Sequence, residues 1–295
     1  MPRPHRPTPE LPAHMAELYR RFPFDRSLAQ DPLSCVRPYR DEPAAAEVAG
    51  LFAATLAIGT TTSIRHAFTR WQEAIGTDLL TYVDRAPSRG IPVGLRTFRH
   101  RWIRGDQLHF LAQTVGDIRS DEGSIENVFM EGFREGGFAG GLDGLARRLR
   151  AGPGSTEAPP PGYARLFPSP LDDGRSPCKR AALFVRWMVR TDYPDLGVWH
   201  QVPVAALQVP LDHHVFWIAY HLGLTQRKTR GWAAVEDVTQ ALQRIDPNDP
   251  IKYDFVLCHT GISGDCPKTR DITVCGPCVV RPDCLLWRRA PRAGG

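Results

Sequence analysis

Four cysteines near the end of the chain constrain its folding more than any other sequence feature. They follow the pattern Cys266-x8-Cys275-x2-Cys278-x5-Cys284, which occupies nineteen positions in a protein with seven cysteines. Thiolates at this spacing can bind one centre, either a tetrahedral zinc ion or a 4Fe-4S cluster. A zinc ribbon usually has two C-x2-C pairs separated by a longer loop. The single C-x2-C pair followed by a C-x5-C step therefore favours a 4Fe-4S cluster, with zinc, or no metal, as the alternatives.

The beginning of the chain and its apolar runs indicate the cellular compartment. No apolar segment typical of a signal peptide follows the opening MPRPHRPTPELPAH. The longest apolar run, residues 49–58, is too short to span a bilayer. Clustered thiols in a protein that is not secreted are more often metal ligands than disulfides. We therefore expect a soluble, cytoplasmic protein that does not associate with a membrane.

The chain is mildly basic, and most of its basic residues are arginines. The formal net charge is +5 and the pI is about 8.9, which is compatible with an acidic partner such as nucleic acid. Of the 37 basic residues only four are lysines, namely Lys179, Lys228, Lys252 and Lys268. A genomic preference for arginine explains this excess. Arginine cannot be deprotonated, so a role as an amine nucleophile is open only to these lysines.

Apolar residues recur at three- and four-residue spacing along most of the chain, which predicts a mainly α-helical fold. The predicted helices cover residues 44–57, 63–75, 106–118, 124–133, 141–150, 179–190, 212–221, 231–244 and 252–259. Residues 151–177 are rich in proline and glycine, which predicts a loop. No strand-type alternation persists and no repeat is visible. We therefore expect an all-α protein, and 295 residues suffice for one large or two modest domains.

Lys179 and Asp212 each stand at the start of a predicted helix. For Lys179, the positive end of the helix dipole and partial desolvation would both favour the uncharged amine, which can form a Schiff base. A solvated lysine without a special role is the simpler interpretation. Asp212 lies in the segment PLDHHV, where an aspartate is most often an N-cap. Beside a reactive lysine, however, its carboxylate can stabilise positive charge.

The order of these motifs resembles that of the helix-hairpin-helix (HhH-GPD) DNA glycosylases, specifically the endonuclease III branch with its iron–sulfur loop. That branch has a lysine in G-x-G-R-K-T-A, an aspartate in V-D-T-H, and cysteines spaced C-x6-C-x2-C-x5-C. Here Lys179-Arg180-Ala181, residues 211–215 and the four cysteines match these segments. The resemblance covers residues 176–284. Stretches such as LFVRWMVR and VPLDHHV also resemble an uncharacterised bacterial family.

The resemblance implies an architecture of two helical lobes with a cleft between them. A helical barrel over residues 37–203 would present Lys179, with the loop 151–177 inside it. Residues 1–36 and 204–295 would form the second lobe, which carries the metal-cluster loop 266–284. This arrangement remains an implication of the family and does not come from periodicity.

The resemblance also implies an activity, a partner and a cofactor. It predicts a monomeric, nucleoid-associated enzyme of DNA base-excision repair, a DNA glycosylase with AP-lyase activity. The substrate would be double-stranded DNA with an oxidised base. Lys179 would form the Schiff base and Asp212 would assist it, while Cys266, Cys275, Cys278 and Cys284 would bind the 4Fe-4S cluster.

Further residues are expected to contact the DNA. The candidates for binding its backbone are Arg175, Arg180, Lys268, Arg270 and Arg281. The candidates for a base pocket or for intercalation are Thr60, Thr61, Trp187 and Trp199. For the tryptophans, a place in the core is the commoner role of such a side chain on an apolar helix.

Two departures from the family pattern leave the substrate open. Arg175-Ser176-Pro177-Cys178 replaces the glycine hairpin that grips a phosphate through backbone N–H groups. The long segment between Lys179 and Asp212 resembles that of the archaeal 8-oxoguanine DNA glycosylases, which lack the cluster. One alternative function is a non-catalytic nucleic-acid-binding iron–sulfur protein. A redox protein using Cys275-x2-Cys278 is disfavoured because no βαβ pattern surrounds that pair.

Overall fold

The chain divides into two compact units. The computed structural model describes residues 6–76, 78–154 and 158–288. Unit 1 comprises Met1–Pro23, Gly174–Lys179 and Leu207–Gly295, and unit 2 comprises Phe24–Asp173 and Arg180–Ala206. The predicted boundaries between the two domains lay at residues 37 and 204. The prediction placed Lys179 in the barrel domain, whereas the structure places it in unit 1. Residues 1–5, 155–157 and 289–295 of the predicted domains and loop lie outside the described residues.

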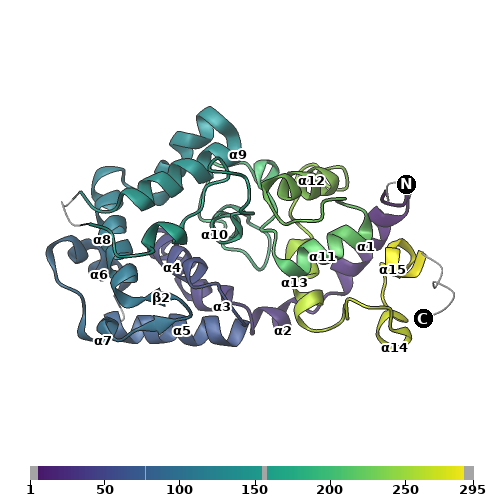
Figure 1. Cartoon of the computed structure of the whole chain (residues 1–295), viewed down its shortest axis with the longest axis horizontal. Helices are drawn as coiled ribbons and strands as arrows, with labels where there is room; N and C mark the ends of the chain where they lie inside the picture. The colour runs from purple at the N-terminus through teal and green to yellow at the C-terminus, as the bar shows by residue number, and fades with distance from the viewer. Residues whose placement is uncertain (1–5, 77, 155–157, 289–295) are drawn as a thin grey trace. The chain divides into compact units, whose positions relative to one another are not determined.

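Unit 2 is helical apart from one short antiparallel hairpin in the part of the chain that the structure describes. Its α-helices are α2 (Phe24–Leu28), α3 (Leu33–Val36), α4 (Pro43–Thr55), α5 (Thr61–Ile75), α6 (Leu79–Arg85), α7 (Val93–Arg96), α8 (Gly105–Asp121), α9 (Ile125–Ala151) and α10 (Lys179–Val189), of which Lys179 belongs to unit 1. Its 3-10 helices are η1 (Arg37–Tyr39), η2 (Ala86–Ser88), η3 (Tyr163–Leu166) and η4 (Val204–Ala206). The hairpin strands are β1 (Arg99–His100) and β2 (Ile103–Arg104) (Figure 1).

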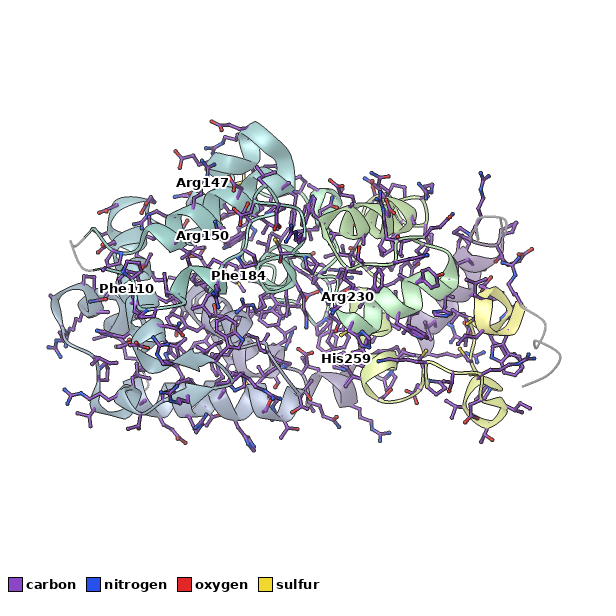
Figure 2. The ribbon with its side chains drawn as sticks, in the orientation of Figure 1. Phe110, Arg147, Arg150, Phe184, Arg230 and His259 are labelled. Atoms are coloured by element: carbon purple, nitrogen blue, oxygen red, sulfur yellow. The ribbon has the colours of Figure 1, made fainter. Side chains whose placement is uncertain are left out.

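The core of unit 2 forms around α4, which is apolar on all sides and is buried along most of its length. Phe52 of α4 stacks on Trp71 of α5, with 4.2 Å between the ring centroids. Phe110 and Phe184 lie in the interior of the same unit (Figure 2), with exposed fractions of 3% and 0%. Helix α9 is interrupted at Gly136 and Gly137, which explains why the sequence predicted two helices there.

Unit 1 is also helical. Its helices are α1 (Leu11–Arg21), α11 (His213–Leu222), α12 (Trp232–Gln243), α13 (Asp254–Ile262), α14 (Ile272–Cys275), η5 (Arg281–Asp283) and α15 (Leu285–Arg288). Helix α11 packs against α13. A Cβ atom at Gly261 of α13 would lie 2.5 Å from the Cβ of His214, so glycine permits this close approach. Gly261 therefore serves the packing of α13 against α11.

The prediction of a mainly helical fold is confirmed, and the long predicted helices lie close to α4, α5, α8, α9, α10, α11, α12 and α13. Helices α1 and α6 and the hairpin were not predicted. Helix α6 and the hairpin are short, whereas α1 spans eleven residues and buries Leu11 and Met15. Within the described ranges, no helix combines the length and the apolar character that crossing a membrane requires.

Candidate functional site

Lys179 and Asp212, the two residues that the motifs selected, lie together in unit 1. The Lys179 Nζ is 3.8 Å from the Asp212 Oδ2. The two side chains are 32% and 11% exposed, so the amine is reachable from solvent while the carboxylate is mostly covered. Each begins a helix, because Lys179 is the first residue of α10 and Asp212 is the N-cap of α11.

Asp212 has more than one role in this arrangement. Its Oδ1 accepts a hydrogen bond from the Val215 backbone N–H at 2.7 Å, which is the N-cap interaction that the sequence predicted. Its Oδ2 faces Lys179 and also accepts a hydrogen bond from the Cys258 thiol at 3.3 Å. One carboxylate oxygen is therefore used by the helix, and the other is directed at the lysine.

The segment before Lys179 holds it in place with a turn that contains little glycine. The Cys178 backbone N–H donates to the Ser176 hydroxyl, and the Cys178 backbone has a left-handed φ of 47°. The Trp232 backbone N–H donates to the Gly174 carbonyl at 2.8 Å, which fastens the segment to the start of α12. This turn therefore fixes the chain just before Lys179 at the start of α10.

Two histidines after Asp212 are held in the neutral form. The pKa values of His213 and His214 are lowered, chiefly by burial and also by the nearby charge of Lys268, while Asp212 opposes the shift. The charge of Lys268, from the cysteine loop, is therefore near enough to both rings to lower their pKa values.

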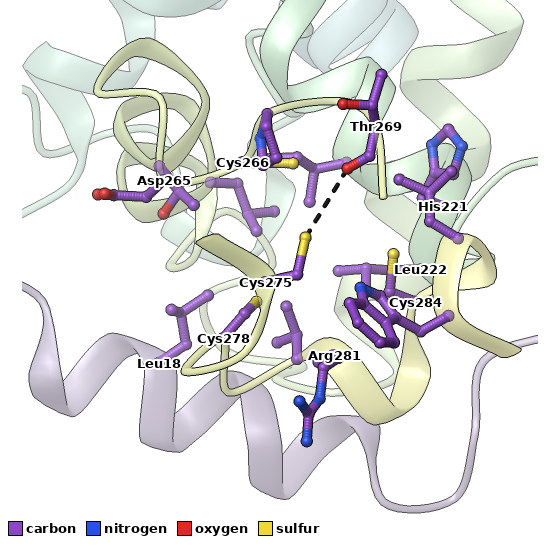
Figure 3. A pocket seen from close by; sticks show the side chains of 17 residues that line it. Leu18, His221, Leu222, Asp265, Cys266, Thr269, Cys275, Cys278, Arg281 and Cys284 are labelled. Carbon is purple, nitrogen blue, oxygen red and sulfur yellow. Dashed lines mark hydrogen bonds between the residues drawn. The ribbon is translucent and has the colours of Figure 1, made fainter. Parts of the chain in front are cut away.

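The four cysteines line one apolar cavity of about 50 Å³ in unit 1 (Figure 3). Leu18 of α1 and Leu222 of α11 line the same cavity. The Cys275 thiol donates to the Thr269 carbonyl at 3.8 Å. All four cysteines of the loop are thus among the residues that line this cavity.

The thiols are not arranged as metal ligands in this structure. Burial raises the pKa values of Cys266, Cys278 and Cys284, so these thiols are neutral at neutral pH, whereas a metal binds thiolates. In the described part of the chain, no group of three or more His, Cys, Asp or Glu side chains is placed to hold a metal ion. The donor chemistry suits iron or zinc, and the convergence of the ligands stays a prediction.

The cysteine loop is fastened at both ends. The Cys266 backbone N–H donates to the Thr260 carbonyl at the end of α13, at 3.0 Å. Near the other end, the buried Asp283 accepts a hydrogen bond from Thr8 and lies 2.8 Å from the His14 ring. The carboxylate of Asp271 caps the short helix that ends at Cys275. These contacts join parts of the loop to α13 and to the N-terminal segment.

The predicted DNA-binding residues divide into three groups. Arg175 belongs to the segment before Lys179 that is anchored at Gly174, and the charge of Lys268 lowers the pKa of His213. Arg270 and Arg281 are exposed on the cysteine loop, with their guanidinium carbons 4.4 and 5.4 Å from the Trp287 ring centroid. Arg180 belongs to unit 2 and donates to the carbonyls of Thr55 and Leu166, so folding uses much of its hydrogen-bonding capacity.

The candidates for a base pocket all lie in unit 2, where folding accounts for most of them. Thr60 is exposed and caps α5 through its hydroxyl, and Thr61 is the first residue of that helix. Trp187 and Trp199 are buried, with exposed fractions of 1% and 3%, and the Trp199 indole N–H donates to Glu47 at 2.6 Å. Their rings are part of the core and present no open face to a base.

Sequence reasoning missed two residues near Lys179. Cys258 was overlooked because an isolated cysteine on a helix gives no signal of its contact with Asp212. Arg230 lowers the pKa of His213 together with burial and Lys268. Its signal was present, because QRKTR is a basic run between α11 and α12 and residues 226–230 are exposed.

The chain belongs to a family of proteins of unknown function, DUF2400, whose model matches residues 31–263. Lys179, Asp212 and Cys258 lie inside the matched range, and the four loop cysteines lie beyond its end. No curated protein and no solved structure matched the chain. Family membership therefore assigns no activity, and the function has to be argued from the site.

Proposed function

We propose that this protein is a DNA glycosylase with AP-lyase activity that acts on a damaged base in double-stranded DNA. The observation that carries the proposal is the pairing of Lys179 with Asp212. They are 33 residues apart in sequence, each begins a helix, and they lie 3.8 Å from each other. A cation at the N-terminus of a helix opposes the helix dipole, so folding alone gives little reason for a lysine there.

The proposed reaction begins when the extruded nucleotide enters the site, at a cost of a few kcal/mol that is smallest for a damaged base. The neutral Lys179 Nζ attacks C1′ of the deoxyribose, and the C1′–N bond breaks with its electron pair leaving on the base. The proton that Nζ loses is transferred to the departing base. Asp212 supplies negative charge beside the positive charge that develops at the sugar. Opening of the sugar ring leaves a Schiff base between Nζ and C1′, and β-elimination then breaks the bond between C3′ and the 3′ phosphate oxygen.

The neutral histidines and the Cys258 thiol suit this chemistry. Asp212 is the only charged partner recorded for Lys179 among the described residues, and neutral His213 and His214 add no competing charge beside it. The Cys258 thiol occupies the carboxylate oxygen that faces the amine. These contacts orient the Asp212 carboxylate towards the amine.

We further propose that the cysteine loop holds a 4Fe-4S cluster, with zinc as the alternative. Cys266, Cys275, Cys278 and Cys284 would be the ligands, and the apolar cavity that they line supports this role. Bound there, the cluster would order the loop and take no part in the bond cleavage. Arg270, Arg281 and Lys268 would then present positive charge to the DNA backbone.

The decisive experiment is borohydride trapping, which reduces a Schiff base to a stable covalent adduct. Duplexes carrying an abasic site, 8-oxoguanine or an oxidised pyrimidine are incubated with the protein and sodium borohydride. We expect a trapped adduct with at least one of them. Because the chain has only four lysines, Lys228→Gln, Lys252→Gln and Lys268→Gln provide matched controls for Lys179→Gln.

We expect only Lys179→Gln to abolish the adduct, while the three control variants retain it. Adduct formation by Lys179→Gln at the wild-type level would refute the role of this lysine. Failure of the folded, metal-loaded wild type to trap any of the duplexes would refute the lyase activity.

The second candidate function is a non-catalytic nucleic-acid-binding protein. The observation that favours it is the replacement of the phosphate-binding glycine hairpin by the turn at Ser176 and Cys178. Binding of duplex DNA without any trapped adduct would support this function over the first.

A further inference from the structure

The short hairpin of unit 2 presents an exposed tryptophan on a strongly basic segment. Strands β1 and β2 pair Arg99 with Arg104 and His100 with Ile103, so that Arg101 and Trp102 form the tip. The Trp102 side chain is 45% exposed, although tryptophan is usually well buried. This hairpin, residues 99–104, has no role in the mechanism described above.

The hairpin is held rigidly against the body of unit 2. The buried His100 ring hydrogen-bonds to the carbonyls of Leu56 and Ile58, each at 3.0 Å. On the other side, Arg70 donates to the Arg99 carbonyl at 2.8 Å. Trp102 is therefore displayed on a fixed support and is not a side chain on a loose loop.

The tip residues do not follow the preferences of a tight turn. Two-residue hairpin turns favour glycine or asparagine where φ is positive, but here Arg101 has a φ of 55°. A Cβ at Gly59 would lie 2.9 Å from the Arg101 guanidinium, so this side chain packs directly on the turn before α5. Residues that a turn disfavours are most readily explained by a role at the surface.

Positive charge surrounds the exposed ring. Residues 95–104 contain four arginines and no acidic residue. Only Arg104 of these has an acidic partner among the described residues, Asp106 at 2.8 Å. The guanidinium carbon of Arg180 lies 5.7 Å from the Trp102 ring centroid and covers one side of the ring. An aromatic face among arginines is the arrangement with which proteins stack unpaired bases while holding the adjacent phosphates.

We propose that the 99–104 hairpin is a nucleic-acid contact, in which Trp102 stacks on an unpaired base and Arg99 binds a phosphate. The proposal rests on the proposed function in one respect only, namely that the nucleic acid is DNA. In this proposal Trp102 takes the insertion role that the sequence analysis gave to Thr60 and Thr61. Those two residues instead form the start of α5.

Fluorescence anisotropy with the full-length, metal-loaded protein tests the proposal. The probes are a labelled duplex with one tetrahydrofuran abasic analogue, which leaves the opposite base unpaired, and the same duplex fully paired. We expect Trp102→Ala to weaken binding of the first duplex roughly tenfold to hundredfold and to change binding of the second much less. Trp102→Phe should restore most of the affinity, and Leu171→Ala, which removes another exposed apolar side chain of unit 2, should have no effect.

A parallel salt titration tests the phosphate contact. Arg99→Ala should reduce the slope of the logarithm of affinity against the logarithm of salt concentration by about one, for both duplexes. Borohydride trapping on a duplex with a natural abasic site separates this proposal from the proposed function, because the tetrahydrofuran analogue cannot form a Schiff base. If the wild type forms an adduct on the natural site while Trp102→Ala binds the tetrahydrofuran duplex as tightly as the wild type does, the hairpin proposal alone fails. If Trp102→Ala loses affinity but the wild type traps nothing, the hairpin proposal stands and the lyase proposal fails.

Discussion

Two ion pairs that draw their cations from α10 differ in almost every physical respect. In unit 2, the Asp195 carboxylate lies 3.1 Å from Arg186 and 3.2 Å from Arg190, and all three side chains are at most 3% exposed. In unit 1, Lys179 lies 3.8 Å from Asp212 and is 32% exposed. The first pair is short, buried and supplied with two cations for one carboxylate, whereas the second is long and open to solvent.

The difference shows which charged side chains contribute to the stability of the fold and which do not. Arg186 and Arg190 lie at the C-terminal end of α10, where cations are favoured by the helix dipole and serve the interior. Lys179 lies at the other end of the helix, where the dipole disfavours it, and its single long ion pair contributes little stability. The same contrast extends to the four cysteine thiols, which line a cavity in unit 1 without being arranged to hold an ion.

The largest effect should come from the thiols, because metal binding and the order of the loop depend on all four. Cys278→Ser is expected to reduce the iron content from about four atoms per chain to less than about one. Elemental analysis and visible absorption of protein purified without oxygen measure this loss. Because burial raises the pKa of Cys278, binding must displace protons, so apparent metal affinity should rise with pH.

Cys35→Ser is the matched control, since Cys35 is half-buried in unit 2 and should leave the metal content unchanged. Retention of the full iron content by Cys278→Ser would exclude this residue as a ligand. If the purified protein instead contained about one zinc ion, the alternative of a tetrahedral site would be established.

A large loss of stability should follow when the buried ion pair of Asp195 with Arg186 and Arg190 is broken. Asp195→Ala leaves two arginines buried without their carboxylate and should lower the free energy of unfolding by about 3–5 kcal/mol. Lys179→Gln should change it by less than about 1 kcal/mol, because its pair is partly exposed. Urea unfolding followed by circular dichroism measures both.

Asp192→Ala is the control for this comparison. The Asp192 carboxylate also pairs with Arg190, at 3.3 Å, but is 66% exposed and should contribute less than about 1 kcal/mol. A loss for Lys179→Gln as large as that for Asp195→Ala would mean that Lys179 serves folding, and the contrast between the two pairs would collapse.

The smallest change in stability should separate the two roles of Asp212. Asp212→Asn keeps an N-cap of similar quality, so the free energy of unfolding should hardly change, whereas Asp212→Ala should lower it by about 1 kcal/mol. Both variants remove the negative charge and should slow base release by about 100-fold or more. Single-turnover base excision and urea unfolding are the two measurements.

If Asp212→Asn released the base at the wild-type rate, the carboxylate would be only a helix cap. In that case the proximity of Lys179 and Asp212 would carry no catalytic meaning. A fall in activity matched by an equal fall in stability for Asp212→Asn would lead to the same conclusion.

Much of the fold could be read from local patterns, and part of the candidate site could be as well. The apolar period located α4, α8 and α12, and the N-cap character of Asp212 follows from its position before an apolar run. Arg186 and Arg190 show the limit of such patterns. Nothing in the local pattern shows that both are buried, because the Asp195 carboxylate that pairs with them comes from the segment after α10.

The sequence by itself determined the helical class, the lysine and aspartate at two helix starts, and four thiols close enough to share one cavity. Each of these depends on residues within a few turns of one another. Only the tertiary structure decided that Asp212 turns one oxygen to Lys179 and accepts the Cys258 thiol, and that Trp102 stands exposed while Trp187 and Trp199 do not. Such contacts join residues distant in the chain, and packing selects them through burial, which no local pattern records.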